Sequence, residues 1–116
     1  MLVNTNTNTC AWICEHPVDM RKSIDALAVL VEPLFNANPL SGHLFVFLCR
    51  HRIRIKILYW DRTGFALWYK RLEGARFAHP GEIAKAGLNM AQLSAWLEGM
   101  PIVKSSFKTV NATRVS

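Results

Sequence analysis

The sequence predicts a single α+β domain, in which one long helix packs on the apolar face of an antiparallel β-sheet meander and a shorter C-terminal helix follows. Three runs between residues 43 and 72 are rich in apolar, β-branched and aromatic side chains, with short polar connections between them. A segment from Met20 has the apolar period of a helix, and a second such segment follows Asn89. At 116 residues the chain has the size of one domain with its own core.

The densest of these runs, residues 53–73, is predicted to form a β-hairpin. The segment Asp61-Arg62-Thr63-Gly64 supplies turn residues between two strands that end at Trp60 and begin at Phe65. If Trp60 pairs with Phe65, the pairs behind it on the same face are Leu58 with Leu67, Lys56 with Tyr69 and Arg54 with Arg71. A three-residue loop would shift this pairing.

This register gives the hairpin two different faces. One face is mostly apolar and is expected to point towards the core: Ile53, Ile55, Ile57, Tyr59, Ala66, Trp68, Lys70 and Leu72. The other face is apolar near the turn and basic towards the open end, and is expected to face solvent or a partner. Two interpretations of the basic face stay open: a solvated sheet surface whose cations oppose aggregation, or a nucleic-acid surface on which cations neutralise phosphates and aromatic rings stack on bases.

The segments before the hairpin are predicted from composition and period. Residues 1–10, rich in Asn and Thr, are expected to be disordered, and residues 11–14 to form an edge strand. A helix is expected from Met20, with Asp19 as its N-cap and with Pro33 ending or kinking it near Glu32. Its buried stripe is predicted to be Met20, Ile24, Leu27, Val31 and Leu34. Residues 43–48 are predicted to form the first strand of the meander.

The segments after the hairpin contain one loop and one helix. Glycine and proline make residues 77–87 a predicted loop. Asn89 is predicted to begin a helix through a capping box with Gln92, and Gly99 to end it. The apolar side of this helix is Met90, Leu93, Trp96 and Leu97. The domain is therefore expected to span residues 11–99, with a flexible basic tail over residues 100–116.

The charge balance favours a polyanionic partner. There are 14 Lys and Arg residues against 8 Asp and Glu residues, a formal net charge of +6. No apolar run approaches the roughly 20 residues that cross a bilayer, and the N-terminus lacks the pattern of a secretion signal. We therefore expect a cytoplasmic protein that does not bind a membrane. Arg21 and Lys22, expected in the first turn of the first helix, would make its N-terminus an anion site or would simply be solvated.

Metal-dependent chemistry is the less favoured alternative. Cysteine and histidine side chains that a zinc site would need are present, but their spacing matches no standard zinc motif: Cys10, Cys14, His16, Cys49 and His51. The carboxylates that a Mg²⁺-dependent nuclease would need are Asp19, Asp25, Asp61 and Glu73. Asp19 has an ordinary explanation as a helix cap, Asp61 as a turn residue and Glu73 as an ion-pair partner of the basic residues before it. No catalytic residue, metal or cofactor is therefore predicted.

Several stretches taken together resemble a known family. They are Asp19-Met20-Arg21-Lys22-Ser23, Ser41-Gly42-His43-Leu44-Phe45-Val46-Phe47, Tyr59-Trp60-Asp61 with Gly64-Phe65, and Lys70-Arg71-Leu72-Glu73. In this order, over roughly residues 12–99, they resemble the TnpB-type accessory protein, the product of the small second open reading frame in the bacterial insertion-sequence family numbered sixty-six. The resemblance implies an accessory role in DNA transposition beside a separate, larger transposase that carries the catalytic acidic residues.

We therefore predict a non-enzymatic accessory protein of transposition that binds DNA, with the element's transposase as a second partner. The candidate DNA-binding residues are Arg21, Lys22, Arg50, Arg52, Arg54, Lys56, Trp60, Tyr69, Lys70 and Arg71. Trp60 and Tyr69 are the candidate stacking groups among them, and Lys70 is the weakest candidate because the register places it on the core face. The rival hypothesis is a module that docks on the transposase through an apolar anchor of Trp60, Phe65 and Leu67 with a cationic rim.

Overall fold

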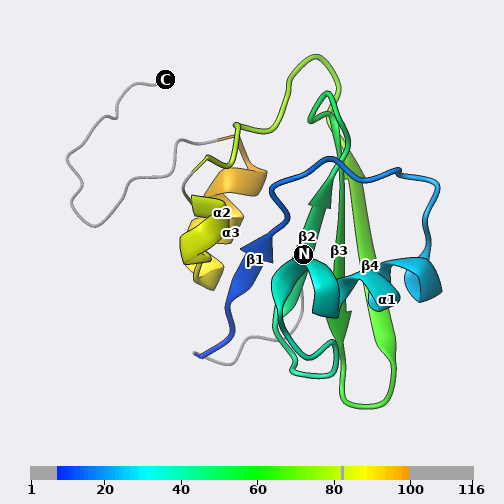
Figure 1. Ribbon diagram of the computed structural model, residues 1–116. Coiled ribbons are helices and arrows are strands. Elements are labelled where there is room, and N and C mark those ends of the chain that lie inside the picture. The colour runs from blue at the N-terminus through cyan, green and yellow to red at the C-terminus, as the bar shows by residue number, and fades with distance from the viewer. Residues whose placement is uncertain (1–7, 82, 100–116) are drawn as a thin grey trace.

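A four-stranded β-sheet with helices on both faces forms the domain (Figure 1). The computed structural model describes residues 8–81 and 83–99. Its elements are β1 (Ala11–Ile13), α1 (Ile24–Phe35), β2 (Leu44–Leu48), β3 (Arg54–Trp60), β4 (Phe65–Arg71), α2 (Ile83–Ala86) and α3 (Met90–Leu97). The predicted α+β class is confirmed. The predicted disordered N-terminus and basic tail lie mostly in residues 1–7 and 100–116, outside the described residues, and the predicted domain boundaries stay predictions.

The sheet has the strand order β1-β2-β3-β4 and is mixed rather than wholly antiparallel. The pairs β2–β3 and β3–β4 are antiparallel, which confirms the predicted meander. The edge strand β1 is confirmed too, but it runs parallel to β2, with Ala11 opposite Leu44. Parallel neighbours need a long crossover connection, and here that connection contains α1. The expectation of a purely antiparallel sheet overlooked this crossover.

The predicted register of the hairpin is confirmed at each of its four pairs. Trp60 lies opposite Phe65, and the pairs behind it are Leu58 with Leu67, Lys56 with Tyr69 and Arg54 with Arg71. The turn is closed by the N–H of Asp61, which donates to the carbonyl oxygen of Gly64 at 2.7 Å. Alternating side chains therefore fix which hairpin residues share a face.

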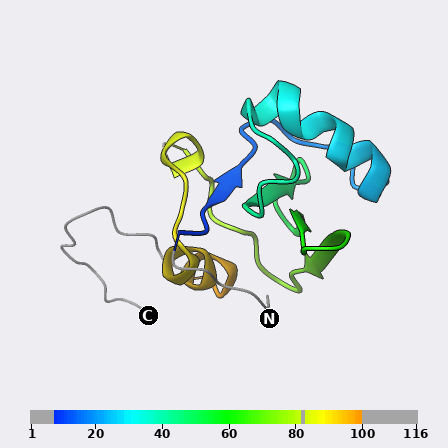
Figure 2. The same cartoon turned by 90° about the horizontal axis from the view of Figure 1, so that it is seen from below.

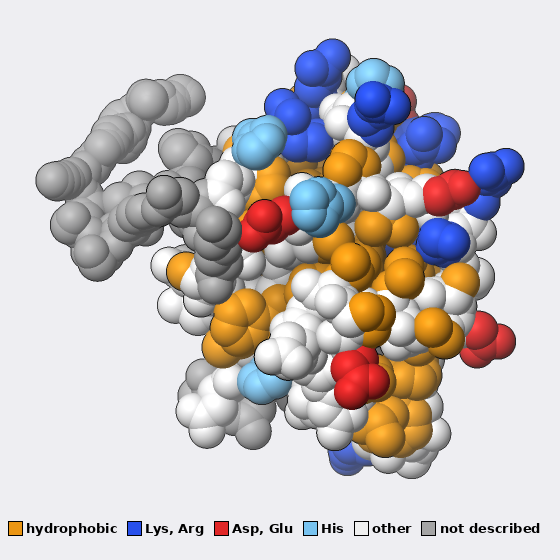
Figure 3. All heavy atoms as spheres, viewed as in Figure 1, with side chains coloured by type: hydrophobic (Ala, Val, Ile, Leu, Met, Phe, Trp, Pro, Cys, Tyr) orange, Lys and Arg blue, Asp and Glu red, His pale blue; other side chains and the backbone are white. Residues whose placement is uncertain are grey.

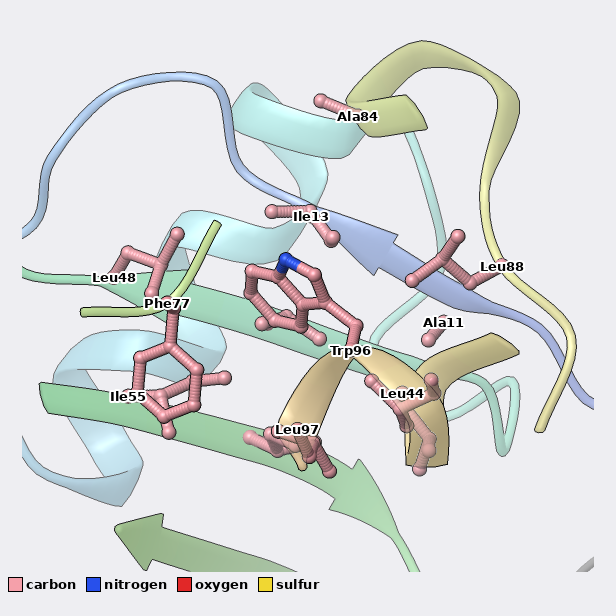
Figure 4. Close-up of a cluster of buried hydrophobic side chains, with 13 residues drawn as sticks. Ala11, Ile13, Leu44, Leu48, Ile55, Phe77, Ala84, Leu88, Trp96 and Leu97 are labelled. Carbon is pink, nitrogen blue, oxygen red and sulfur yellow. The ribbon is translucent and has the colours of Figure 1, made fainter. Parts of the chain in front are cut away.

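The first face of the sheet carries the larger core, beneath α3 and α2 (Figure 2). Ile55 and Ile57 of β3 are fully buried there, as predicted. Trp96 of α3 packs beside Phe77 at a ring-centroid distance of 5.4 Å, and both side chains are fully buried (Figure 4). Phe77 lies in a segment that was predicted to be only a loop. Its burial, and the short α2 that follows, were missed because glycine and proline dominate that stretch.

The second face of the sheet is covered in part by α1. Phe45, Phe47 and Leu58 are fully buried there against Leu27 and Val31 of the helix. We expected the long helix on the opposite face, and this expectation was wrong. The reason lies in β2, whose five residues are all buried, so that this strand is apolar towards both faces and needs a cover on each.

The beginning of α1 was also predicted wrongly. The helix begins at Ile24, with Ser23 as N-cap, instead of at Met20 with Asp19 as N-cap. Asp19 instead accepts a hydrogen bond from the backbone N–H of Arg21 at 2.9 Å, which closes a local turn. Arg21 and Lys22 therefore precede the helix rather than lying in its first turn. Met20 still packs against the α1-side core from its position outside the helix.

The end of α1 departs from the prediction in two respects. The helix continues through Pro33 to Phe35 and ends at Asn36 in the left-handed conformation. Proline removes one backbone N–H, and this is tolerable because the carbonyl that loses its partner belongs to Val29, whose side chain is 74% exposed on the solvent side of the helix. Leu34 is 42% exposed, and Phe35 packs on the core in its place.

The predicted C-terminal helix is confirmed in detail. The side chain of Asn89 accepts from the N–H of Gln92 at 2.8 Å, and the side chain of Gln92 accepts from the N–H of Asn89 at 2.9 Å. This is the predicted capping box. Leu93, Trp96 and Leu97 are buried as expected. The helix thereby covers the first face of the sheet, whereas α1 covers the second face only in part.

Candidate nucleic-acid interface

A basic groove lies beside α1 at the end of the sheet where β2 turns into β3. Four segments line it: residues 18–21, the β2–β3 turn, β3 and β4. Its residues are Val18, Asp19, Met20, Arg21, Cys49, Arg50, Arg54, Lys56, Leu67 and Tyr69. Figure 3 shows Lys and Arg side chains gathered towards this end of the molecule. We call this hollow of about 720 Å³ the basic groove.

Arg50 and Arg54 are the least restrained cations of the groove. Both are exposed, and neither forms an ion pair with a carboxylate of the described residues, although the Arg54 side chain interacts with the sulfur of Cys49. The turn that separates them is held by Cys49, whose N–H donates to the carbonyl of Arg54 at 3.1 Å and whose sulfur accepts from the N–H of Arg54 at 3.4 Å. Burial raises the pKa of the Cys49 thiol, but N–H groups of Arg54, Ile53 and His51 outweigh it and the pKa is lowered.

Lys56 ties the groove to the segment before α1. Its ammonium group donates to the carbonyl oxygen of Lys22 at 2.8 Å and lies 5.7 Å from the centre of the Tyr69 ring. An ammonium group has three donors, so this arrangement leaves capacity for an anion in the groove. Tyr69 is 50% exposed, which leaves part of its ring accessible for stacking.

Arg21 brings a fourth cation, but it is paired with the one carboxylate that lines the groove. Its guanidinium donates to both oxygens of Asp19, at 2.8 to 3.1 Å. Hydrogen bonds from Arg21 hold the pKa of Asp19 well below its ordinary range, and the same pair raises the pKa of Arg21. Asp19 therefore stays ionised, and the groove keeps an excess of positive charge because Arg50, Arg54 and Lys56 are unmatched by acidic groups lining it.

Not all predicted DNA-binding residues meet in this groove. Arg52 lies towards the other face, where its Nε donates to the carbonyl of Phe77 at 3.0 Å and holds that loop against the sheet. Lys70 pairs with Ile55 on the α3 face of the sheet. Arg71 shares the groove face but binds Glu73 at 2.8 Å. Lys22 is exposed and contributes its carbonyl oxygen to Lys56.

Trp60 lies at the opposite end of β3 from the groove. Its ring packs edge-on against Phe65 at a centroid distance of 5.2 Å. Phe65 and Leu67 in turn pack against the α1-side core, and all three side chains are only partly exposed. Two residues of the predicted apolar anchor, Phe65 and Leu67, are therefore partly covered by the α1-side core, while Trp60 packs on Phe65 at its edge.

Val18, which lines the groove beside Met20 and Leu67, was not singled out from the sequence. Val18 is buried, and Met20 packs on the core beneath the cations. The N–H of Val18 donates to the carbonyl oxygen of Leu48, and this bond continues the β1–β2 side of the sheet past β1. No sequence pattern predicts such a bond, so the sequence offered no sign of the position of Val18.

Metal coordination finds little support in the part of the chain that the structure describes. No group of three or more His, Cys, Asp or Glu residues there is placed to hold a metal ion. Of the carboxylates considered for a nuclease, Asp19 and Glu73 are engaged by Arg21 and Arg71. None of the helices in residues 8–81 and 83–99 has the length and apolar character needed to cross a membrane.

The structure defines a class of small α+β proteins that carry a basic groove on one face of a mostly antiparallel sheet. Comparison with known proteins narrows this class. The family model described as "IS66 Orf2 like protein" matches residues 9–106, and the chain belongs to this family. The assignment confirms the predicted resemblance and supports an accessory role in the transposition of an insertion sequence.

Two curated proteins of Sinorhizobium fredii (strain NBRC 101917 / NGR234) are similar to this chain. "Uncharacterized protein y4hO" is 35% identical over 100 residues, which cover 85% of this chain and 87% of that protein. "Uncharacterized protein y4jC" is 35% identical over 68 residues, which cover 59% of this chain and 58% of that protein. No solved structure matches the chain.

Proposed function

We propose that this protein is a non-enzymatic accessory factor of transposition that binds DNA through the basic groove. The observation that carries the proposal is the convergence of Arg21, Arg50, Arg54 and Lys56, from three separate segments, on one groove with the half-exposed ring of Tyr69. Cations neutralise phosphates and release counterions, while an aromatic ring adds contact with sugar or base. A run of basic residues in one loop can be incidental surface charge. Cations that come from separate segments and line one groove are harder to explain in that way.

The location and partners of the protein follow from this role. Element DNA and the element's transposase are the proposed partners, and the cytoplasm of a bacterial cell is the proposed location. The partly covered positions of Trp60, Phe65 and Leu67 give the rival transposase-docking anchor no added support.

Fluorescence anisotropy of the full chain with element-end DNA, and with scrambled DNA of equal length, tests the proposal over a salt series. Three to four phosphate contacts predict that affinity falls roughly 40- to 150-fold between 50 and 200 mM salt. Tighter binding of element ends would show sequence preference. Absence of binding at low salt would overturn the proposal.

A matched pair of variants ties the binding to the groove. Arg54→Gln removes one charge from the groove, and Lys70→Gln removes one charge from the same hairpin on the opposite face. Arg54→Gln should lower the slope of log affinity against log salt by about one, while Lys70→Gln should leave it unchanged. Equal effects of the two variants would mean that overall charge, and not the groove, governs binding.

A further inference from the structure

A second hollow lies at the other end of β3, and neither the proposed duplex contact nor the family assignment gives it a role. It measures about 520 Å³ and is lined by three segments: residues 8–9, residues 40–44 and residues 59–62. We call it the hairpin-end groove. Its size lies within the range of sites that hold small molecules. Two of the motifs singled out in the sequence, Ser41-Gly42-His43 and Tyr59-Trp60-Asp61, meet here although they are far apart in the chain.

The groove contains aromatic rings and unused hydrogen-bond donors. Tyr59 and Trp60 are each partly exposed. In the part of the chain that the structure describes, neither the indole N–H of Trp60 nor the exposed guanidinium of Arg62 has a hydrogen-bonding partner. Burial, together with the charge of Asp61, raises the pKa of Tyr59, so its hydroxyl keeps the proton that makes it a donor.

His43 adds a further donor. Its Nδ1 accepts a hydrogen bond from the backbone N–H of Cys10 at 3.1 Å. In the neutral ring this assigns the proton to Nε2, which is then a donor. Asp61 is the one carboxylate lining the groove, and it supplies acceptors of the kind that exocyclic amino groups of bases recognise. The set therefore combines ring surface, a cation and both donors and acceptors.

We infer that the hairpin-end groove takes an unpaired nucleotide, with the base against Trp60 and the phosphate at Arg62. This inference rests on the proposed function, since it makes the preferred ligand DNA with a single-stranded segment beside the duplex. Aromatic rings bind any base by stacking, while an adjacent arginine binds the backbone. A fully paired duplex keeps its bases stacked within the helix and cannot use such a site.

The spacing of the two grooves suits one continuous ligand. Arg54 and Trp60 are the two ends of β3, and six steps of about 3.3 Å separate them by roughly 20 Å. The same length corresponds to about six steps along one strand of DNA. Since α1 packs on this face between the two grooves, a strand that joins them must pass around the helix and be longer than this minimum. A duplex held in the basic groove can reach the hairpin-end groove through such a single-stranded extension.

The test compares two DNA ligands with the same duplex, one blunt and one carrying a single-stranded extension of about ten nucleotides, in both polarities. The full chain should bind one of the extended ligands about fivefold or more tightly than the blunt one, as expected for one stacked base. Trp60→Leu, which keeps apolar packing on Phe65, should remove this gain, and Trp60→Phe should restore part of it. None of these changes should alter binding of the blunt duplex.

Arg62→Gln should reduce the gain from the extension without affecting the blunt duplex. If neither polarity improves binding, the inference is overturned while the duplex hypothesis stands. If Arg62→Gln removes the gain but Trp60→Leu does not, charge alone explains the gain and the stacking site is overturned. If Arg54→Gln leaves blunt-duplex binding intact, it is the proposed function that fails.

Discussion

The two faces of the sheet are covered by helices in different ways. On the α3 face, Trp96, Leu93 and Phe77 are fully buried. On the α1 face, the helix buries Phe45, Phe47 and Leu58, but the end of the face beyond it remains open as the basic groove. One face is therefore covered by a packed core, while the other is divided between packing and a charged surface.

This difference explains why most basic side chains of β3 and β4 lie on the α1 face of the sheet. A cation directly beneath α3 would be buried at a high cost in free energy, and the one cation of β3 and β4 on this face, Lys70, remains partly exposed. On the α1 face they lie past the end of the helix, where Lys56 can reach the carbonyl of Lys22 and Arg54 remains in water. Changes on the two faces should accordingly affect different measurements.

The largest effect is expected from truncating the α3-face core. Trp96→Ala should lower the free energy of unfolding by about 3–5 kcal/mol, because it removes a fully buried aromatic side chain and leaves a cavity. Urea denaturation followed by circular dichroism measures this change. The matched variant Tyr69→Ala, at a side chain that is 50% exposed, should cost less than about 1 kcal/mol. Similar losses for both would contradict the contrast between the faces.

The second largest effect is expected on the affinity for duplex DNA and not on the free energy of unfolding. The double variant Arg50→Gln with Arg54→Gln should lower the slope of log affinity against log salt by about two and weaken duplex binding roughly tenfold or more at low salt. Its free energy of unfolding should stay within about 0.5 kcal/mol of the parent, because both side chains are exposed and make no ion pair to the described residues. A large loss of stability would show that these arginines belong to the structure of the turn.

The N-caps of α1 and α3 should also differ in how much they contribute to the free energy of unfolding. Asn89→Ala removes a capping side chain that accepts from the N–H of Gln92 and should cost about 1 kcal/mol of unfolding free energy. Ser23→Ala removes an N-cap whose side chain makes no capping hydrogen bond and should cost appreciably less. Thermal or urea unfolding of both variants checks this order, and a reversed order would mean that α1 depends on its N-cap in solution.

The smallest expected effect is a gain, and not a loss, of affinity for duplex DNA. Asp19→Asn removes the carboxylate of the basic groove and releases Arg21, so duplex affinity should rise several-fold. Since Arg21 holds the pKa of Asp19 below its ordinary value, the parent keeps this negative charge as the pH falls. The difference between variant and parent should therefore persist down to about pH 4. Anisotropy titrations at several pH values measure it, and weaker binding by the variant would mean that Asp19 orients Arg21 for DNA.

The sequence was most informative where local rules act alone. The hairpin register follows from alternation and from the turn at Asp61, and the start of α3 follows from the pairing of Asn89 with Gln92. The same reasoning failed at α1. Asp19 has the side chain of an N-cap, but it closes a turn with Arg21 four residues before the N-cap that the helix uses. Side-chain chemistry is the same in the two cases, and tertiary packing decides between them.

The candidate site could be predicted only in part. The cross-strand neighbours Lys56 and Tyr69 were assigned to one face correctly, and Lys70 to the other. What sequence could not supply was the position of α1, which divides that face and sends Trp60 to one groove and Tyr69 to the other. The continuous apolar character of β2 was the available sign that both faces need a helix.

The most direct measurement is a titration of the ¹⁵N-labelled full chain with a short duplex, followed by the chemical shifts of its backbone amides. The basic groove predicts that the largest changes fall in residues 19–22, 49–56 and 67–71, on the α1 side of the sheet. Amides of α3 should stay unchanged, since that helix covers the opposite face. Changes concentrated in α3, with none in the groove segments, would contradict DNA binding through the basic groove.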